Sequence, residues 1–212
     1  PAALSAYWHP LYSLLLYGVS ALFPSREWDA FAGHLLNLAL FVLGWVGFRL
    51  LAKAMAGGIA PERKPGLLRI ADAVYFLSSL VLGQLWLITP DFLVALFIYV
   101  SVLLVIRATR DPGRRGHYIS LGLALAAGYW TKAILFHYTL FLFGFLIAKP
   151  AALSRKYLLL GLAAFLALAS IHALLLSHPT GRFSFTVAGR TAYVLEVNRL
   201  SSYGVADRGE AG

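Results

Sequence analysis

The chain has 212 residues, of which 60% are hydrophobic and only 13% are charged, and its formal net charge is +9 at neutral pH. Soluble domains carry about 25% charged residues, and a soluble core of this size cannot bury so much apolar surface, so the composition argues against a soluble fold and for lipid as the solvent. The basic residues stand in short clusters between apolar runs, which indicates membrane topology and argues against a nucleic-acid-binding patch. The absence of cysteine excludes disulfides and thiolate metal sites.

The first apolar stretch, residues 10–23, is too short for a membrane span and is predicted to be a helix lying at the outer membrane interface. Six longer segments follow, at 28–51, 67–88, 92–106, 118–131, 133–148 and 157–177. A span needs about 20 residues, so the first, second and sixth are long enough and the third is slightly short. The pattern predicts an all-α, polytopic bundle of about six transmembrane helices.

The fourth and fifth segments form one run of apolar residues that only Lys132 interrupts. Basic clusters lie on both sides of this run, within residues 107–115 and 149–156. Positively charged loops stay on the cytoplasmic side, so the chain must cross and return between them. We therefore predict a turn at Thr131–Lys132, with two short spans in a thin or shielded part of the membrane.

The same rule places the 52–66 loop inside, and the three inner loops then hold most of the eighteen Lys and Arg residues. Residues 1–177 are predicted to form the transmembrane domain, and residues 178–212 to begin an outer-face segment with a short strand or hairpin near 182–187. The chain begins without Met and ends abruptly, and we interpret it as a fragment of a longer protein that lacks its first span.

Asp91, in the sequence TPDF, is a carboxylate between two long apolar runs. One interpretation is a helix N-cap, because Asp is among the best caps and the third segment starts directly after it. The other is a group that orients a hydroxyl or a cation at the membrane edge. Both roles are compatible with one position.

Lys132 also has two interpretations. Its side chain can extend from a helix end to the headgroups, or it can supply a positive charge to a phosphate. Because a lysine within an apolar run is costly, its position favours a role in the turn or in ligand binding.

The remaining polar residues are less specific. His9, near the N-terminus, and Arg182 and Arg190, in the tail, are further candidates for binding a substrate or an anion on the outer face. Three histidines within helices, His34, His137 and His172, are expected to make packing or interhelical hydrogen bonds. Asp72, near the inner end of the second segment, is expected to interact with the helix dipole or to pair with Arg69. Walker, GxGxxG, GxSxG and HExxH motifs are absent from the sequence.

Taken in order, the stretches YWHPLYSLLL, SREWDAFAGHLLNLAL, TPDFLVALFIYV, GYWTKAILFHY and GRFSFTVAGRTAYVLEVN resemble bacterial members of glycosyltransferase family 39. These are relatives of the dolichyl-phosphate-mannose–protein mannosyltransferases and of the lipid A aminoarabinose transferases. The resemblance covers nearly all of the chain. It implies a GT-C fold in the inner membrane of a bacterium, with a site facing the periplasm.

By this resemblance, the protein would move a sugar from a polyprenyl-phosphate donor to an acceptor that the sequence does not identify. Lys132 would bind the donor phosphate, Asp91 would support catalysis, and Tyr12 of the Pro-Leu-Tyr element would join the substrate-binding residues. The family's principal acid lies in the first outer loop, upstream of residue 1, so the fragment itself is expected to be inactive. Some relatives use a divalent metal, although no ligand cluster here indicates one, and no other cofactor is expected.

Two other functions are compatible with the same composition. A polytopic transporter or lipid flippase would use ionisable residues near the membrane midplane, of which His137 and His172 are the candidates. A non-catalytic membrane scaffold would need Asp91 and Lys132 for stability alone.

Overall fold

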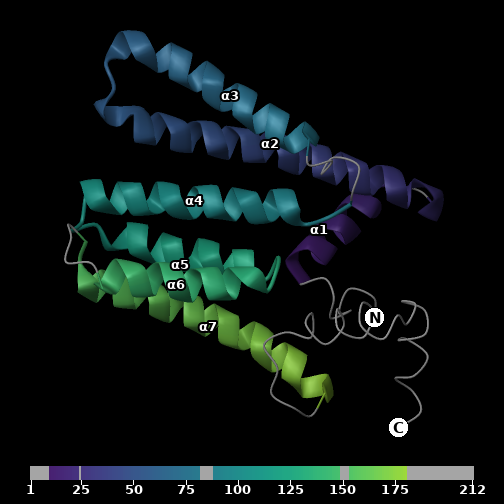
Figure 1. Cartoon of the computed structure of the whole chain (residues 1–212). Helices are drawn as coiled ribbons and strands as arrows, with labels where there is room; N and C mark the ends of the chain where they lie inside the picture. The colour runs from purple at the N-terminus through teal and green to yellow at the C-terminus, as the bar shows by residue number, and fades with distance from the viewer. Residues whose placement is uncertain (1–9, 24, 82–87, 149–152, 181–212) are drawn as a thin grey trace, which may run out of the picture.

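The structure is a computed structural model that describes residues 10–23, 25–81, 88–148 and 153–180. Within these ranges all regular secondary structure is helical, so the all-α prediction is confirmed. The strand or hairpin predicted near 182–187 lies outside the described residues. Seven α-helices are labelled in Figure 1, and three short 3₁₀ turns connect some of them.

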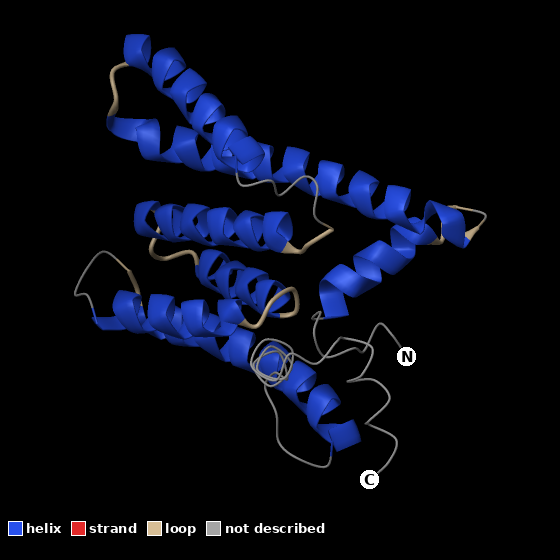
Figure 2. Ribbon diagram, turned by 45° about the vertical axis from the view of Figure 1, so that its right-hand side comes forward, coloured by secondary structure: helices blue, strands red, loops and turns tan. Residues whose placement is uncertain are grey.

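The helices run back and forth along one direction, with α1 placed across one end (Figures 1 and 2). Their bounds are α1 Pro10–Ser20, α2 Asp29–Met55, α3 Lys64–Val81, α4 Asp91–Arg110, α5 Arg115–Tyr129, α6 Ile134–Ala148 and α7 Arg155–Thr180. The connections α2–α3, α4–α5 and α6–α7 all lie at one end of the bundle, as Figure 1 shows. We call this the basic end, because these connections and the helix turns beside them carry the clustered Lys and Arg residues. The start of α4 and the α5–α6 turn lie at the opposite end, beside α1.

Three segments are long and apolar enough to cross a membrane, namely Asp29–Gly58, Asp91–Arg110 and Arg155–Leu175. They correspond to the first, third and sixth predicted segments, and the third extends beyond its predicted end because α4 continues to Arg110. The other three predicted spans do not reach this length and composition within the described residues. Helices α5 and α6 have 15 residues each, so each is about 22 Å long, shorter than the roughly 30 Å apolar core of a bilayer.

The predicted break at Thr131–Lys132 is confirmed. Helix α5 ends at Tyr129 and α6 begins at Ile134, and the backbone N–H groups of Thr131 and Lys132 both donate to the carbonyl of Gly128, at 2.9 and 3.1 Å. The Thr131 hydroxyl donates to Ala127 at 3.1 Å. The last turn of α5 therefore closes on itself, and the chain reverses direction as the flanking charges require.

Glycines set the closest helix contact, which joins α5 and α7. A Cβ atom on Gly122 would overlap the carbonyl oxygen of Gly161, and one on Gly161 would overlap the carbonyl oxygen of Tyr118. This approach is possible only because neither glycine has a side chain. Around it lies the larger apolar core, which includes Leu121, Leu125, Phe143, Leu158 and Phe165.

Helix α4 packs against α2 on one side and against α5 on the other. Gly47 of α2 admits the side chain of Leu96, and Gly44 admits the Tyr75 ring of α3, whose hydroxyl donates to the Phe41 carbonyl at 2.8 Å. Small residues on α2 therefore receive large side chains from both neighbours, which fixes the order α3–α2–α4–α5–α7 across the bundle.

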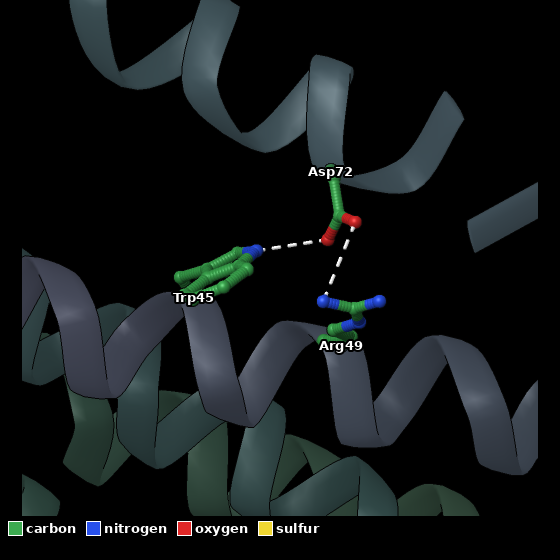
Figure 3. Close-up of polar contacts among 3 residues, drawn as sticks. All are labelled: Trp45, Arg49 and Asp72. Atoms are coloured by element: carbon green, nitrogen blue, oxygen red, sulfur yellow. Dashed lines mark hydrogen bonds and ion pairs between the residues drawn. The ribbon is translucent and has the colours of Figure 1, made fainter. Parts of the chain in front are cut away.

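The predicted pairing of Asp72 with Arg69 is wrong. The Asp72 carboxylate on α3 faces α2, where it accepts a hydrogen bond from the Trp45 indole at 2.8 Å and lies 3.7 Å from the Arg49 guanidinium (Figure 3). Asp72 lies on the face of α3 that packs against α2. It therefore contacts residues of α2 and not Arg69 of its own helix.

Candidate functional site

Three segments far apart in the sequence meet at the end of the bundle opposite the basic end. They are the start of α1, the start of α4 and the α5–α6 turn (Figure 1). The backbone N–H of Leu11 donates to the Trp130 carbonyl at 2.9 Å, which fixes the first turn of α1 to the α5–α6 turn. The part of the predicted outer-face segment beyond residue 180 lies outside the described residues.

Apolar packing holds these segments in place. Tyr12 of α1, Leu36 and Leu40 of α2, and Phe92 and Leu93 of α4 form one buried cluster, with exposed fractions of 6% or less. The cluster joins α1 to the N-terminal turns of α4. The polar groups of Asp91 and Lys132 lie at the edge of this cluster.

The central contact of the site is an ion pair between Asp91 and Lys132. The Lys132 ammonium donates to one carboxylate oxygen of Asp91 at 2.6 Å, and the two side chains are 49% and 33% exposed, respectively. Such a short charge-assisted hydrogen bond brings together the two residues that the sequence singled out. An ion pair this exposed contributes little to folding, about 0–1 kcal/mol.

Asp91 does not cap α4. Pro90 occupies the N-cap position, and its carbonyl accepts the first hydrogen bond of the helix from Val94 at 2.9 Å. Asp91 is the first residue of the helix, where its charge still favours the positive end of the helix dipole. Its carboxylate is turned to Lys132, so the N-cap interpretation is corrected to a first-turn residue that contacts the α5–α6 turn.

Tyr12, in the same apolar cluster as Phe92, is 2% exposed. Its hydroxyl donates to the side-chain oxygen of Asn37 on α2 at 3.0 Å. Burial, and secondarily the negative charge of Asp91, raise the pKa of Tyr12 to about 12, so the phenol stays protonated at neutral pH. This geometry supports a positioning role, in which Tyr12 fixes α1 against α2.

Asn37 is the residue of the site that the sequence analysis did not single out. It is 1% exposed within an otherwise apolar stretch of α2. A polar side chain within a membrane span is costly without a partner, and this rule alone identifies Asn37 as a candidate functional or structural residue. What the sequence could not supply was the partner, since Tyr12 is 25 residues away.

Thr89 adds a further polar group to the same turn. Its hydroxyl oxygen is buried and has no hydrogen-bond partner among the described residues. A buried hydroxyl without a partner costs roughly 1–3 kcal/mol. The TPD sequence at the start of α4 therefore places one unsatisfied hydroxyl two residues before the ion-paired carboxylate.

The other candidates from the sequence are placed as follows. His9, Arg182 and Arg190 lie outside the described residues. His137 is exposed on α6, whereas His172 on α7 is buried against the rings of Tyr129 and Trp130, with ring centroids 5.1 and 5.7 Å away. The two histidines that a transporter would use therefore do not line a common buried path.

A resident metal does not fit the described part of the chain. Within it, no group of three or more His, Asp and Glu residues is arranged to hold an ion. The acid at the site, Asp91, is instead hydrogen bonded to a lysine, whose positive charge opposes cation binding.

In chemical terms, the site offers an ammonium group with spare donors and a carboxylate with a spare oxygen. Lysine has three N–H donors, and the contact with Asp91 uses one of them, so the half-exposed Lys132 can donate to an anion from the membrane surface.

Comparison of the chain with protein-family models, curated proteins and solved structures found no match in any of the three.

Proposed function

We propose that this chain forms part of a membrane glycosyltransferase that takes a sugar from a polyprenyl-phosphate-linked donor and passes it to an acceptor at the Asp91–Lys132 end of the bundle. The observation that carries the proposal is the 2.6 Å contact between Asp91, in the first turn of α4, and Lys132, in the α5–α6 turn, where both side chains are partly exposed. The resemblance of the ordered sequence segments to glycosyltransferase family 39 supplies the reaction.

The physical demands of such a donor fit this position. Its isoprenoid tail is soluble in lipid, while its phosphate and sugar belong at the interface. The exposed apolar side chains on the outer surfaces of the helices suit the tail, and Lys132 suits the phosphate. As the glycosidic bond breaks, negative charge develops on the departing phosphate, and a fixed ammonium group stabilises that charge.

In this scheme Asp91 both assists and opposes binding of the donor. It holds the Lys132 ammonium in one place, and its free oxygen can accept a hydrogen bond from a sugar or acceptor hydroxyl. It also repels the donor phosphate, since both are anionic. By the resemblance the main base lies upstream of residue 1, so we assign Asp91 a supporting role.

The proposed topology follows the distribution of charge. The basic clusters lie at the end opposite the site, and positively charged loops stay in the cytoplasm, so the site would face the outside, which is the periplasm for a bacterial inner membrane. In this arrangement α3, α5 and α6 also cross the membrane, as shorter spans shielded by α2, α4 and α7. This would make six spans of the GT-C type.

The test is donor binding, which does not require the main base. The purified protein in detergent micelles would be titrated with a polyprenyl phosphate and, as the control ligand, with the corresponding polyprenol. Loss of one phosphate-binding ammonium is expected to weaken polyprenyl-phosphate binding by about ten- to a hundredfold in Lys132→Ala, since a charge-assisted contact contributes about 1.5–3 kcal/mol. Lys64→Ala, at the basic end, is the matched control and is expected to bind as the parent does.

Asp91→Asn sharpens the test because, unlike Lys132→Ala, it is not expected to weaken the binding of polyprenyl phosphate. Removing the carboxylate relieves repulsion, so binding of polyprenyl phosphate should stay equal or tighten, while sugar transfer by the protein from the complete gene should fall. Unchanged affinity in Lys132→Ala, or equal binding of the phosphate and the polyprenol, would contradict the role of Lys132. Loss of stability without any change in ligand binding would instead favour the scaffold.

A further inference from the structure

A second polar arrangement lies near the other end of the bundle, on α2. An open groove with a volume of about 390 Å³ is lined by Trp45, Val46, Arg49, Leu50 and Lys53. These five residues are one face of the C-terminal half of α2, and Asp72 of α3 reaches two of them from the side (Figure 3). The proposed transferase site is at the opposite end of the helices, so that site does not account for this groove.

The groove has an apolar part and a charged part, arranged like the acyl chain and the headgroup of a lipid. Trp45 and Val46 are nearer the middle of α2, whereas Arg49 and Lys53 are nearer its end. Val46 and Leu50 are 44% and 45% exposed, so the apolar part of the groove is open to the surroundings of the helix. In a membrane, an acyl chain would lie along the apolar part, and a headgroup would reach the two cations.

The Arg49 guanidinium is held in place but retains hydrogen-bonding capacity. It lies 5.6 Å from the centre of the Trp45 ring, and its separation from Asp72 is 3.7 Å, too long for a hydrogen bond. Its Nε atom is buried and has no hydrogen-bond partner among the described residues. A guanidinium group placed between an aromatic ring and a carboxylate, whose terminal N–H groups make no hydrogen bond to the described residues, suits an anion with several oxygens.

Lys53 stands one helical turn beyond Arg49 on the same face and is exposed. In the last turn of α2 its charge also complements the helix dipole, which is an ordinary role for a lysine in this position. The dipole itself disfavours an anion at this helix end. An anion would therefore be held by the two side chains together, against the dipole and the Asp72 carboxylate.

From this geometry we propose that the groove on α2 binds an anionic phospholipid of the surrounding leaflet, with its phosphate between Arg49 and Lys53 and one acyl chain along Val46 and Leu50. A basic groove on a membrane-spanning helix is the usual way in which proteins select anionic headgroups. The apolar half of the groove identifies the ligand as a lipid, because a free phosphate would make no use of it.

The test uses the protein purified in a zwitterionic detergent and native mass spectrometry with added phosphatidylglycerol or phosphatidylcholine of the same acyl chains. The parent chain is expected to retain phosphatidylglycerol in preference to phosphatidylcholine. Because each basic residue near a membrane surface contributes about 1 kcal/mol, the double variant Arg49→Gln/Lys53→Gln should weaken phosphatidylglycerol binding by at least about tenfold. Binding of phosphatidylcholine should not change.

The matched control is Arg114→Gln/Arg115→Gln, which removes the same charge from the basic end without touching the groove. An equal loss in both double variants would mean diffuse attraction to the basic surface and would overturn the proposal. So would equal retention of the two lipids by the parent chain, or displacement of phosphatidylglycerol by inorganic phosphate.

Asp72→Asn provides an independent check that does not remove either cation. Asparagine keeps an oxygen that can accept the Trp45 hydrogen bond but lacks the negative charge beside Arg49. Phosphatidylglycerol should therefore bind more tightly to this variant than to the parent chain. Weaker or unchanged binding in a variant whose circular dichroism is unaltered would count against a phosphate beside Arg49.

Discussion

The close contact between α5 and α7 gives the most direct test of the fold. In Gly122→Ala, the new methyl group would overlap the Gly161 carbonyl, which is backbone and cannot rotate away. The two helices would have to separate by roughly 1 Å to restore ordinary contact, and that would loosen the packing of Leu121, Leu125 and Phe165 around them. Overpacking of this kind costs about 1–3 kcal/mol.

Gly144→Ala is the control, because a Cβ atom there meets nothing within 4 Å. Both variants replace a helical glycine by alanine, which by itself stabilises a helix by about 0.5–1 kcal/mol. This gain is common to the two variants, so their free energies of unfolding should differ by the overpacking cost, about 1–3 kcal/mol.

The assay is unfolding in mixed micelles by titration with sodium dodecyl sulfate, followed by far-ultraviolet circular dichroism. Gly161→Ala should behave like Gly122→Ala, and the double variant should cost less than the sum, because the first methyl group already separates the helices. Equal stability of Gly122→Ala and Gly144→Ala would refute the close approach of α5 and α7.

Three further predictions concern the Asp91–Lys132 end of the bundle. Tyr12→Phe should remove a hydrogen bond worth about 1 kcal/mol and, in an absorbance titration of tyrosinate, should lower the high-pH amplitude by one tyrosine. Because the pKa of Tyr12 is raised from its ordinary value of 10.0 to about 12, this tyrosine's contribution to stability is present below pH 10 and is lost as the pH rises towards 12. Thr89→Val should leave stability unchanged or raise it by about 1 kcal/mol, since it removes a buried hydroxyl that has no partner among the described residues, and a clear loss in thermal unfolding would show that the hydroxyl is hydrogen bonded. Asp91→Asn should change the free energy of unfolding by less than about 1 kcal/mol, because the ion pair with Lys132 is exposed, and a larger loss would assign the pair to folding.

Much of the fold could be predicted from hydropathy and charge. The turn at Thr131–Lys132 followed from basic clusters on both sides of an apolar run, and the structure places it there because a chain that returns to the same side must reverse between them. The same reasoning predicted that residues near positions 12, 91 and 131 would share one end of the bundle. Periodic, apolar helices of this kind leave few alternatives for the path of the chain.

The details of polar contacts were not predictable in the same way. Asp91 was interpreted as a cap from its local sequence, but Pro90 takes that position and the carboxylate reaches Lys132, 41 residues away. Asp72 was paired with Arg69 on the same helix, but it faces α2 and meets Trp45 and Arg49. In each case the partner lies on another element of the bundle, and the rotation of a helix about its axis depends on tertiary packing that hydropathy and local sequence do not reveal.

The hydrogen bond from Leu11 to Trp130 has a consequence for how the protein is made. Helix α1 leaves the ribosome before its docking partner, the α5–α6 turn, which is synthesised about 120 residues later. At about 5–20 residues per second, that interval is on the order of ten seconds. During this time α1 can already pack against α2, through the hydrogen bond from Tyr12 to Asn37, but it cannot yet bind the α5–α6 turn. The Asp91–Lys132 end is therefore completed only after the chain from α2 to α5 has been made.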